Sequence, residues 1–153
     1  MQITPDEITR LRLNEIVVFG SNLVGTHRTG FALKMKRDYG AADGITEGLS
    51  GCCYALPVKD VHLHWLPLNL IDEAVGRFYS HARQHPFWHF SVTKIGGFTP
   101  GYQPHDLAMA FFRHGMVPSN VSLPRAYWDI LKVKVHPVVF ILPGQPEPAK
   151  LSV

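Results

Sequence analysis

Four consecutive apolar residues, Ile16-Val17-Val18-Phe19, restrict the fold of this chain more than any other feature. Three of the four are β-branched, and such an unbroken run is typical of a strand that is buried on both faces. A strand with one face in water would alternate apolar and polar residues instead. Residues 88–95 and 138–142 predict two further buried strands, and residues 52–57 predict a short strand that leaves the sheet at Pro57. The sequence therefore predicts a sheet covered on both sides.

Amphipathic patterns predict helices between these strands. They are expected over a short stretch from Thr4, and over residues 31–39, 69–84 and 106–114. Thr4-Pro5-Asp6-Glu7 has the form of a capping box with Thr4 as N-cap, Gly40 stops the second helix, and Asn69 is a candidate cap for the third. The apolar face of the third helix is expected to hold Leu70, Ala74, Phe78 and either His81 or Ala82. Strands that alternate with helices predict an α/β fold with a parallel or mixed sheet.

The chain has the size and composition of one globular domain. It contains 153 residues, of which 46% are hydrophobic and 18% charged, enough for one hydrophobic core. No repeat and no linker divides it, so we expect a single domain over residues 1–153, with a loose tail from residue 143. The net charge of +3 is spread along the chain without a basic run. A nucleic-acid track is therefore not indicated, and the mild positive bias suits an anionic ligand.

The sequence carries no sign of export or of a membrane anchor. The first seven residues lack the basic and apolar regions of a signal peptide, and no stretch approaches the ~20 apolar residues of a membrane helix. The two cysteines, Cys52 and Cys53, are adjacent. Because a disulfide between neighbours is strained, we expect reduced thiols. These observations predict a cytoplasmic protein without a membrane partner.

Two glycine-bearing loops follow predicted strands and form the candidate ligand site. The first spans residues 19–30 and the second residues 95–102. In an open α/β sheet, ligands bind at the carboxyl ends of strands, and glycines let backbone N–H groups approach an anion closely. A predicted helix starts near Gly30, where its dipole favours negative charge. Asn22 offers donors and acceptors for sugar hydroxyls, and Arg28 carries a charge that can neutralise a phosphate.

Neither loop matches a standard phosphate-binding signature. The G-x-G-x-x-G fingerprint and the Gly-Lys-Ser/Thr of the Walker loop are both missing from the sequence. Each loop taken alone is also compatible with an ordinary turn in a glycine-containing protein. Two such loops after two buried strands favour a shared ligand site at one edge of the sheet.

The segment from Val18 to Ala32 has a distinctive order: Phe-Gly-Ser-Asn-Leu at residues 19–23, then a glycine, a histidine and a glycine–phenylalanine–alanine helix start. It is similar to a group of short phage and bacterial proteins related to macro domains. Further similar segments follow in the order of that group, so the resemblance covers residues 15–115. They are Tyr54 to Asp60, Leu66 to Leu68, and Val92 to Gly97 with Gly101-Tyr102.

The resemblance implies a three-layer α/β/α sandwich that binds an ADP-ribose-type nucleotide; some macro domains also hydrolyse ADP-ribosyl or ADP-ribose phosphate ester bonds. By this resemblance, Asn22 contacts the distal ribose, the loop from Gly25 to Gly30 surrounds the ribose and the phosphates, and Tyr102 packs beside the ribose. Lys59 recurs near the site in the group. The ligand-binding residues so expected are Gly20, Ser21, Asn22, Gly25, Thr26, His27, Arg28, Thr29, Gly30, Lys59, Gly96, Gly97, Phe98, Gly101 and Tyr102. Nucleic acid enters only as an ADP-ribosylated substrate.

Asn22 and His27 are the candidate catalytic residues. The resemblance gives Asn22 the task of positioning the ribose, while His27 carries an imidazole, a common general base. His27 is equally explained as a polar loop residue. The run Thr26-His27-Arg28-Thr29 stands where macro domains have glycines, and Phe98-Thr99-Pro100 stands where relatives have small residues. A bulky Arg28 either fills the phosphate channel or contacts the phosphates, so a module that binds the nucleotide without turnover is the alternative.

Asp60, His62 and His64 raise a further alternative, a histidine–metal hydrolase. Alternate residues of a strand point to one face, so both imidazoles would reach one ion if this segment were extended. The simpler interpretation is a partly exposed strand with polar residues facing outward, because no third ligand stands at a recognisable spacing. No metal and no cofactor are therefore expected.

Overall fold

The computed structural model describes residues 1–96 and 101–133; the predicted strand at 138–142 and the tail from 143 lie outside them. The described part forms four helices and one sheet of six strands in the order β1-β6-β5-β2-β4-β3. Their bounds are β1 Ile3–Thr4, β2 Glu15–Asn22, α1 Gly30–Tyr39, β3 Gly48–Ser50, β4 Cys53–Lys59, α2 Leu68–Gln84, β5 His89–Val92, α3 Pro104–Phe112, β6 Val121–Pro124 and α4 Arg125–Val133. Neighbouring strands are parallel except β3 and β4, so the sheet is mixed and mostly parallel, as predicted.

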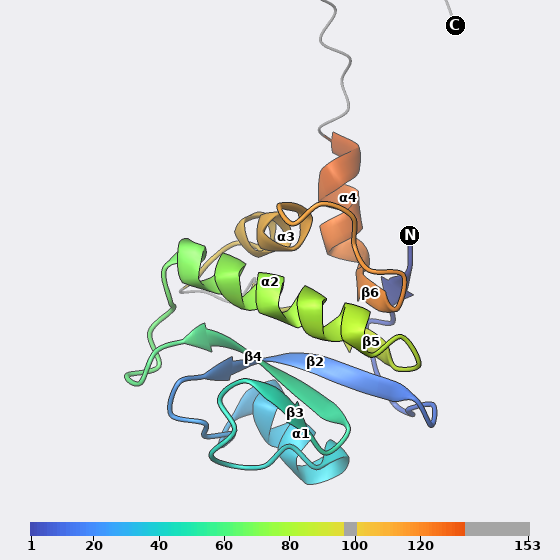
Figure 1. Cartoon of the computed structure of the whole chain (residues 1–153). Helices are drawn as coiled ribbons and strands as arrows, with labels where there is room; N and C mark the ends of the chain where they lie inside the picture. Colours follow the sequence, from blue (N-terminus) through green and yellow to red (C-terminus); the bar gives the residue numbers. More distant parts are fainter. Residues whose placement is uncertain (97–100, 134–153) are drawn as a thin grey trace, which may run out of the picture.

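Helices cover the sheet on both faces. Figure 1 shows α2, α3 and α4 on one side of the sheet and α1 on the other. This arrangement is a three-layer α/β/α sandwich and confirms the predicted fold class. Among the described residues, no helix is both long enough and apolar enough to cross a membrane.

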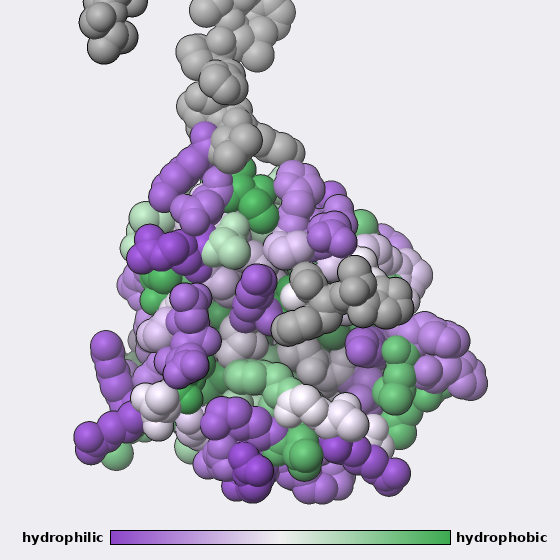
Figure 2. Space-filling model, turned by 180° about the vertical axis from the view of Figure 1, so that it is seen from behind, coloured by the Kyte–Doolittle hydropathy of each residue, from purple (hydrophilic) through white to green (hydrophobic). Residues whose placement is uncertain are grey.

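β2 supplies side chains to two hydrophobic clusters, one on each face of the sheet. Ile16 and Val18 join the larger cluster beneath α2, α3 and α4, while Val17 and Phe19 join the smaller cluster beneath α1. All four are at most 2% exposed, which confirms a strand buried on both faces. On the side of the molecule seen in Figure 2, hydrophilic residues predominate and hydrophobic ones occupy small separate areas.

Two predicted helices agree with the structure apart from their first turns. α1 ends at Tyr39, and Gly40 follows with a left-handed φ of 80° and donates its N–H to the Met35 carbonyl. α2 begins at Leu68 after Pro67, so Asn69 lies inside the helix and is not its cap. Leu70 is 40% exposed, so its place on the apolar face was also predicted wrongly. The buried residues of α2 are Ile71, Ala74, Val75, Phe78, Tyr79 and Ala82.

The predicted helix at the N-terminus is wrong. Thr4 belongs to β1, where it pairs with Pro124 of β6, and its hydroxyl donates to Ser122 Oγ over 3.2 Å. Thr4 is only 2% exposed, so its hydroxyl is held inside the sheet layer and does not cap a helix. A capping signature is local, and pairing with a strand more than a hundred residues away overrides it.

Strand and helix limits also differ from the sequence prediction. β4 continues through Pro57 to Lys59, because β3 pairs with β4 only as far as Ala55 and the missing N–H of Pro57 interrupts no bond on that side. β5 is shorter than expected, and α3 starts at Pro104, where the Gln103 N–H donates to Asp106 Oδ2. The two thiols are free, as predicted. The strands β3 and β6 and the helix α4 had no sequence prediction.

Candidate functional site

The carboxyl ends of β2, β4 and β5 lie side by side and bring the predicted loops to one edge of the sheet. β2 is the middle strand of the three and is parallel to both neighbours. The Leu23 N–H donates to the Lys59 carbonyl over 2.9 Å, which ties the loop after β2 to the end of β4. The two segments expected to share a site therefore begin at adjacent positions.

Asn22 folds the loop between β2 and α1. Its Oδ1 accepts the backbone N–H groups of Val24, Gly25 and Thr26 at 3.1, 2.9 and 3.2 Å. Its Nδ2 donates to the Thr26 carbonyl over 2.8 Å. One amide thus organises four backbone groups, while the second Nδ2 hydrogen takes part in none of these bonds. The resemblance assigned this residue to the ligand, and its role in shaping the loop was missed.

Two of the expected ligand glycines also have a structural reason to be glycine. Gly25 has φ 75°, and a Cβ there would stand 2.8 Å from the Gly44 carbonyl carbon. The Gly44 N–H donates to the Gly25 carbonyl over 2.8 Å, so the two backbones are in direct contact. A Cβ at Gly20 would meet methyl groups of Val58 and Ile95 at 3.1 and 3.2 Å. Both positions serve close packing whether or not a ligand binds.

His27 points into the protein. It is 1% exposed, its Nε2 donates to the Ala42 carbonyl over 3.1 Å, and its ring meets Phe19 edge-on with centroids 5.2 Å apart. Its Nδ1 is buried and makes no hydrogen bond within the described part of the chain. This placement suits an anchor of the loop better than a general base, which must reach its substrate.

Residues 41–47 clamp the first loop from the side, and sequence reasoning assigned them no function. Asp43 accepts the His27 N–H at 3.3 Å and forms an ion pair with Lys36. The hydrogen bond from Lys36 is the main reason that the pKa of Asp43 is lowered. Ser21, an expected ligand contact, is buried and donates its hydroxyl to the Thr46 carbonyl over 2.5 Å. These partners are distant in sequence, so no local pattern announces them.

The outer part of the first loop faces solvent at the start of α1. Arg28, Thr29 and Gly30 are exposed, whereas Thr26 is half-buried. Thr29 is the N-cap residue of α1, but its side chain makes no capping hydrogen bond. The first backbone N–H groups of the helix therefore have no side-chain cap from Thr29. Arg28 stands two positions before the first residue of α1.

Close packing and hydrogen bonds fix the backbone at the start of the second loop. Gly96 has φ 83°, and a Cβ there would stand 2.3 Å from Leu107 Cδ1. The Tyr127 hydroxyl accepts from the Ile95 N–H at 3.1 Å and donates to the Ile95 carbonyl at 2.7 Å. Tyr127 lies on α4 and received no sequence prediction. The expected ligand residues Gly97 and Phe98 lie outside the described residues.

An aromatic corner, formed by Lys59, Trp65, Gly101 and Tyr102, adjoins the end of β4. The Lys59 ammonium lies 5.4 Å from the Trp65 ring centroid, and Trp65 meets Tyr102 edge-on at 5.6 Å. The Tyr102 hydroxyl donates to the Leu66 carbonyl over 3.0 Å. A Cβ at Gly101 would stand 2.3 Å from Trp65 Nε1, so the backbone passes directly over the indole. The structure thus brings together Lys59, Gly101 and Tyr102, which the resemblance placed near the ligand.

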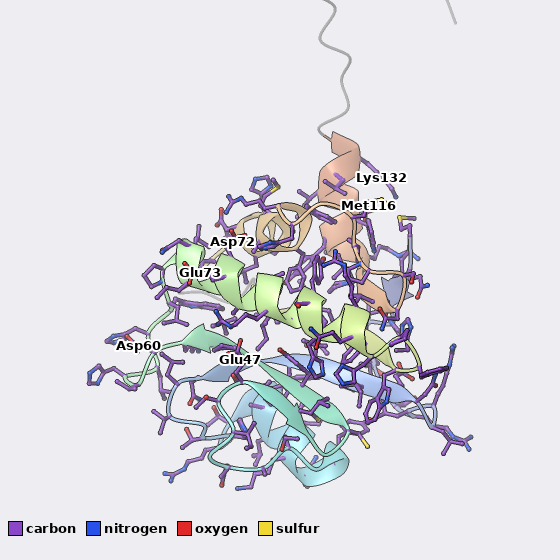
Figure 3. All side chains as sticks on the ribbon, viewed as in Figure 1. Glu47, Asp60, Asp72, Glu73, Met116 and Lys132 are labelled. Atoms are coloured by element: carbon purple, nitrogen blue, oxygen red, sulfur yellow. The ribbon has the colours of Figure 1, made fainter. Side chains whose placement is uncertain are left out.

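The Asp60-x-His-x-His segment is a turn, so the predicted strand is wrong. Asp60 Oδ1 accepts the N–H groups of His62 and His64 at 2.8 and 2.9 Å, and Leu63 has φ 64°. The carboxylate is therefore engaged by its own turn at the edge of the molecule (Figure 3). Within residues 1–96 and 101–133, no group of three His, Cys, Asp or Glu side chains is placed to hold a metal ion.

Comparison with solved structures gives the class of the fold. The macrodomain of Thermus aquaticus DarG is similar with a TM-score of 0.59 at 12% identity, and that of Mycobacterium tuberculosis DarG with a TM-score of 0.56 at 18% identity. Each match covers 80% of this chain and 97% of the other. No protein-family model and no curated protein gives a significant match to the sequence. The chain therefore has a macrodomain-like fold, as the sequence resemblance implied.

Proposed function

We propose that this chain binds an ADP-ribose-type nucleotide at the carboxyl edge of its sheet. The observation that carries the proposal is the loop after β2, which Asn22 folds directly in front of the α1 N-terminus, where Thr29 supplies no side-chain cap. Backbone N–H groups at a helix start, together with the helix dipole, favour a bound phosphate. The macrodomain-like fold supports the same class of ligand, which the sequence resemblance to macro domains implies.

Different residues around the start of α1 contact different parts of the nucleotide in this proposal. In the proposal, the N–H groups at the start of α1 hold a phosphate, and exposed Arg28 neutralises its charge. The free Nδ2 hydrogen of Asn22 donates to a ribose hydroxyl. Lys59 and Tyr102 lie beside the nucleotide at the end of β4, which a hydrogen bond from Leu23 to Lys59 joins to the first loop. Gly25 to Gly30 supply the intervening backbone.

The proposed site has two candidate functions, hydrolysis of the bound nucleotide and binding without turnover. The His27 side chain is buried, and the Ser21 hydroxyl already donates to a carbonyl, so neither group is presented to a ligand for proton transfer. Hydrolysis of an ADP-ribosyl or ADP-ribose phosphate ester bond would then depend on orienting the substrate and a water molecule. These contacts favour a nucleotide-binding module over an acid–base catalyst.

Calorimetric titration of the whole chain with ADP-ribose tests the binding site. We expect saturable binding that weakens by about tenfold in Arg28→Ala, which loses one charge-assisted contact. Asn22→Asp keeps an Oδ1 acceptor for three N–H groups but sets a carboxylate oxygen against the Thr26 carbonyl and adds a negative charge beside the phosphates, and we expect at least about tenfold weaker binding. Arg113→Ala, which removes an exposed arginine at the far end of α3, is the matched control and should bind like the unchanged chain. No binding at millimolar ligand would contradict the proposal.

Product analysis separates the two candidate functions. The chain is incubated with ADP-ribose esterified by phosphate on its distal ribose, and released phosphate is measured. Binding without release is expected for the unchanged chain. Release that appears only in Arg28→Gly would show that Arg28 blocks an otherwise competent site, whereas release by the unchanged chain would establish the hydrolase.

A further inference from the structure

The face of the sheet that carries α1 is covered unequally. Val17 and Phe19 of β2 and Cys53 of β4 lie beneath α1 in the smaller hydrophobic cluster. Ser91 of β5 pairs in register with Val17, and Ser122 of β6 pairs with Ser91, so both serines lie on this same face. Small hydroxyl side chains thus replace aliphatic ones where the face extends beyond α1.

A cavity of about 260 Å³ lies over these hydroxyls, against the amino-terminal ends of β2 and β5. The strand face forms its floor and residues 5–12 form its wall. In Figure 1 this region is on the right, near the N-terminus and the start of β2, whereas the carboxyl edge of β2 is on the left. The cavity is therefore separate from the nucleotide site proposed above, and it lies below the usual 300–1,000 Å³ of drug-sized ligands.

The floor of the cavity is a continuous hydrogen-bond network. The Thr4 hydroxyl donates to Ser122 Oγ over 3.2 Å, Ser122 lies 3.4 Å from Ser91 Oγ, and Ser91 donates to Glu15 Oε1 over 2.7 Å. His89 Nε2 lies 3.0 Å from Ser122 Oγ. Thr4, Ser91 and Ser122 are all at most 3% exposed. These hydroxyls satisfy one another, and Ser91 and Ser122 give the cavity a polar floor.

The rim of the cavity adds charge of both signs. Arg10 and Arg12 line it together with two carboxylates, Glu7 and Glu15, and with His89. The backbone N–H of Arg12 donates to Glu15 Oε2 over 3.1 Å. This bond holds the wall of the cavity against its floor. Burial lowers the pKa of His89, so its imidazole is neutral at neutral pH. Guanidinium groups bind phosphate, while a carboxylate and a neutral imidazole exchange hydrogen bonds with sugar hydroxyls.

We propose that this cavity is a second binding site, for a monosaccharide phosphate whose phosphate contacts Arg10 and Arg12 and whose hydroxyls contact Glu15 and His89. The volume suits one sugar ring with one phosphate. Because Arg10 and Arg12 are exposed and Glu15 bonds to Ser91 of the floor, the phosphate faces outward. This site does not depend on the proposed nucleotide site, because it uses the opposite edge of the sheet and shares no residue with it.

The test is a titration of the whole chain with ribose 5-phosphate, followed by calorimetry and by amide NMR. We expect saturable binding, with shifts confined to β5, β6 and residues 5–12. The double variant R10Q/R12Q changes exposed side chains and should weaken binding by at least about tenfold, while R113Q should leave it unchanged. Glu15→Gln, which retains an acceptor for Ser91, should weaken binding by about tenfold and leave the affinity for inorganic phosphate unchanged.

Four results would overturn the proposal. The first three are no binding at millimolar ribose 5-phosphate, full binding by R10Q/R12Q, and inorganic phosphate binding as tightly as the sugar phosphate. Asn22→Asp distinguishes this site from the nucleotide site. If Asn22→Asp abolishes binding of ribose 5-phosphate, the sugar phosphate occupies the carboxyl edge and the second site is refuted. If Asn22→Asp weakens only ADP-ribose, both sites stand independently.

Discussion

At the scale of single residues, the candidate site consists of groups that shape the backbone more than groups that project from it. The side-chain amide of Asn22 forms hydrogen bonds with four backbone groups, and the His27 side chain is buried. The groups that remain for a ligand in this loop include the backbone N–H groups at the start of α1 and the exposed side chain of Arg28. The proposed recognition of a phosphate by backbone donors is based on this division of roles.

Gly25 provides a test of that backbone shape. Gly25→Ala places a methyl group 2.8 Å from the Gly44 carbonyl carbon and on a residue with φ 75°. We expect a loss of about 2–4 kcal/mol in the free energy of unfolding, measured by urea denaturation, since strain and overlap act together. Gly30→Ala is the matched control: its φ is 57°, but no atom lies within 4 Å of the added methyl group. Equal losses in both variants would show that contact with Gly44 contributes nothing.

At the scale of elements, the loop after β2 depends on the 41–47 segment. Asp43 accepts the His27 N–H and pairs with Lys36 of α1, so a single carboxylate joins the loop, the helix and the clamp. Tyr127 of α4 holds the start of the second loop in a similar way, through both backbone groups of Ile95. Both loops are thereby positioned by elements that never touch the ligand in the proposal.

Acid should loosen this clamp. The hydrogen bond from Lys36 lowers the pKa of Asp43 below its ordinary 3.8 in the folded protein. Its contribution to stability is therefore present above 3.8 and is lost as pH falls through the lower, folded pKa. We expect protection of the His27 amide against hydrogen exchange to fall over this range, and Asp43→Asn to remove the pH dependence.

Asp38→Asn is the control for this experiment. Asp38 is also a paired carboxylate, with its pKa lowered to about 2 by hydrogen bonds from Arg37 and Lys34. Both of these partners lie on α1, so the ion pairs of Asp38 stay within one helix. The protection of the His27 amide against hydrogen exchange should lose its pH dependence in Asp43→Asn and keep it in Asp38→Asn. The reverse result would contradict the assignment to Asp43.

At the scale of the whole molecule, the two adjacent cysteines report on the layer that contains α1. Cys52 is exposed, whereas Cys53 is fully buried in the cluster beneath α1. Burial raises the pKa of Cys53 to about 12, so almost no thiolate exists at pH 8. We expect iodoacetamide to modify Cys52 at once and Cys53 only when the α1 layer opens, as followed by mass spectrometry. In the variant Cys52→Ser, iodoacetamide should modify Cys53 at the same slow rate. Rapid modification of Cys53 would show that the α1 layer does not exclude solvent.

Local sequence determined the elements whose residues interact with their own neighbours. The apolar run of β2, the helix that ends at Gly40 and the break of α2 at His85 each follow from a pattern within one segment. The positions of the first and second loops followed from the same strands. Such features are predictable because their physical causes, periodic burial and backbone propensity, act over a few residues.

Tertiary structure decided the rest, because the partners are distant in the chain. Thr4 became part of a strand through β6, and Ser91 and Ser122 acquired a shared face only when β5 and β6 paired. The burial of His27 required Ala42 and Phe19 from different segments. The sequence alone thus predicted a ligand site at the carboxyl edge of the sheet, while long-range packing determined which side chains lie there and created the polar cavity at the opposite edge.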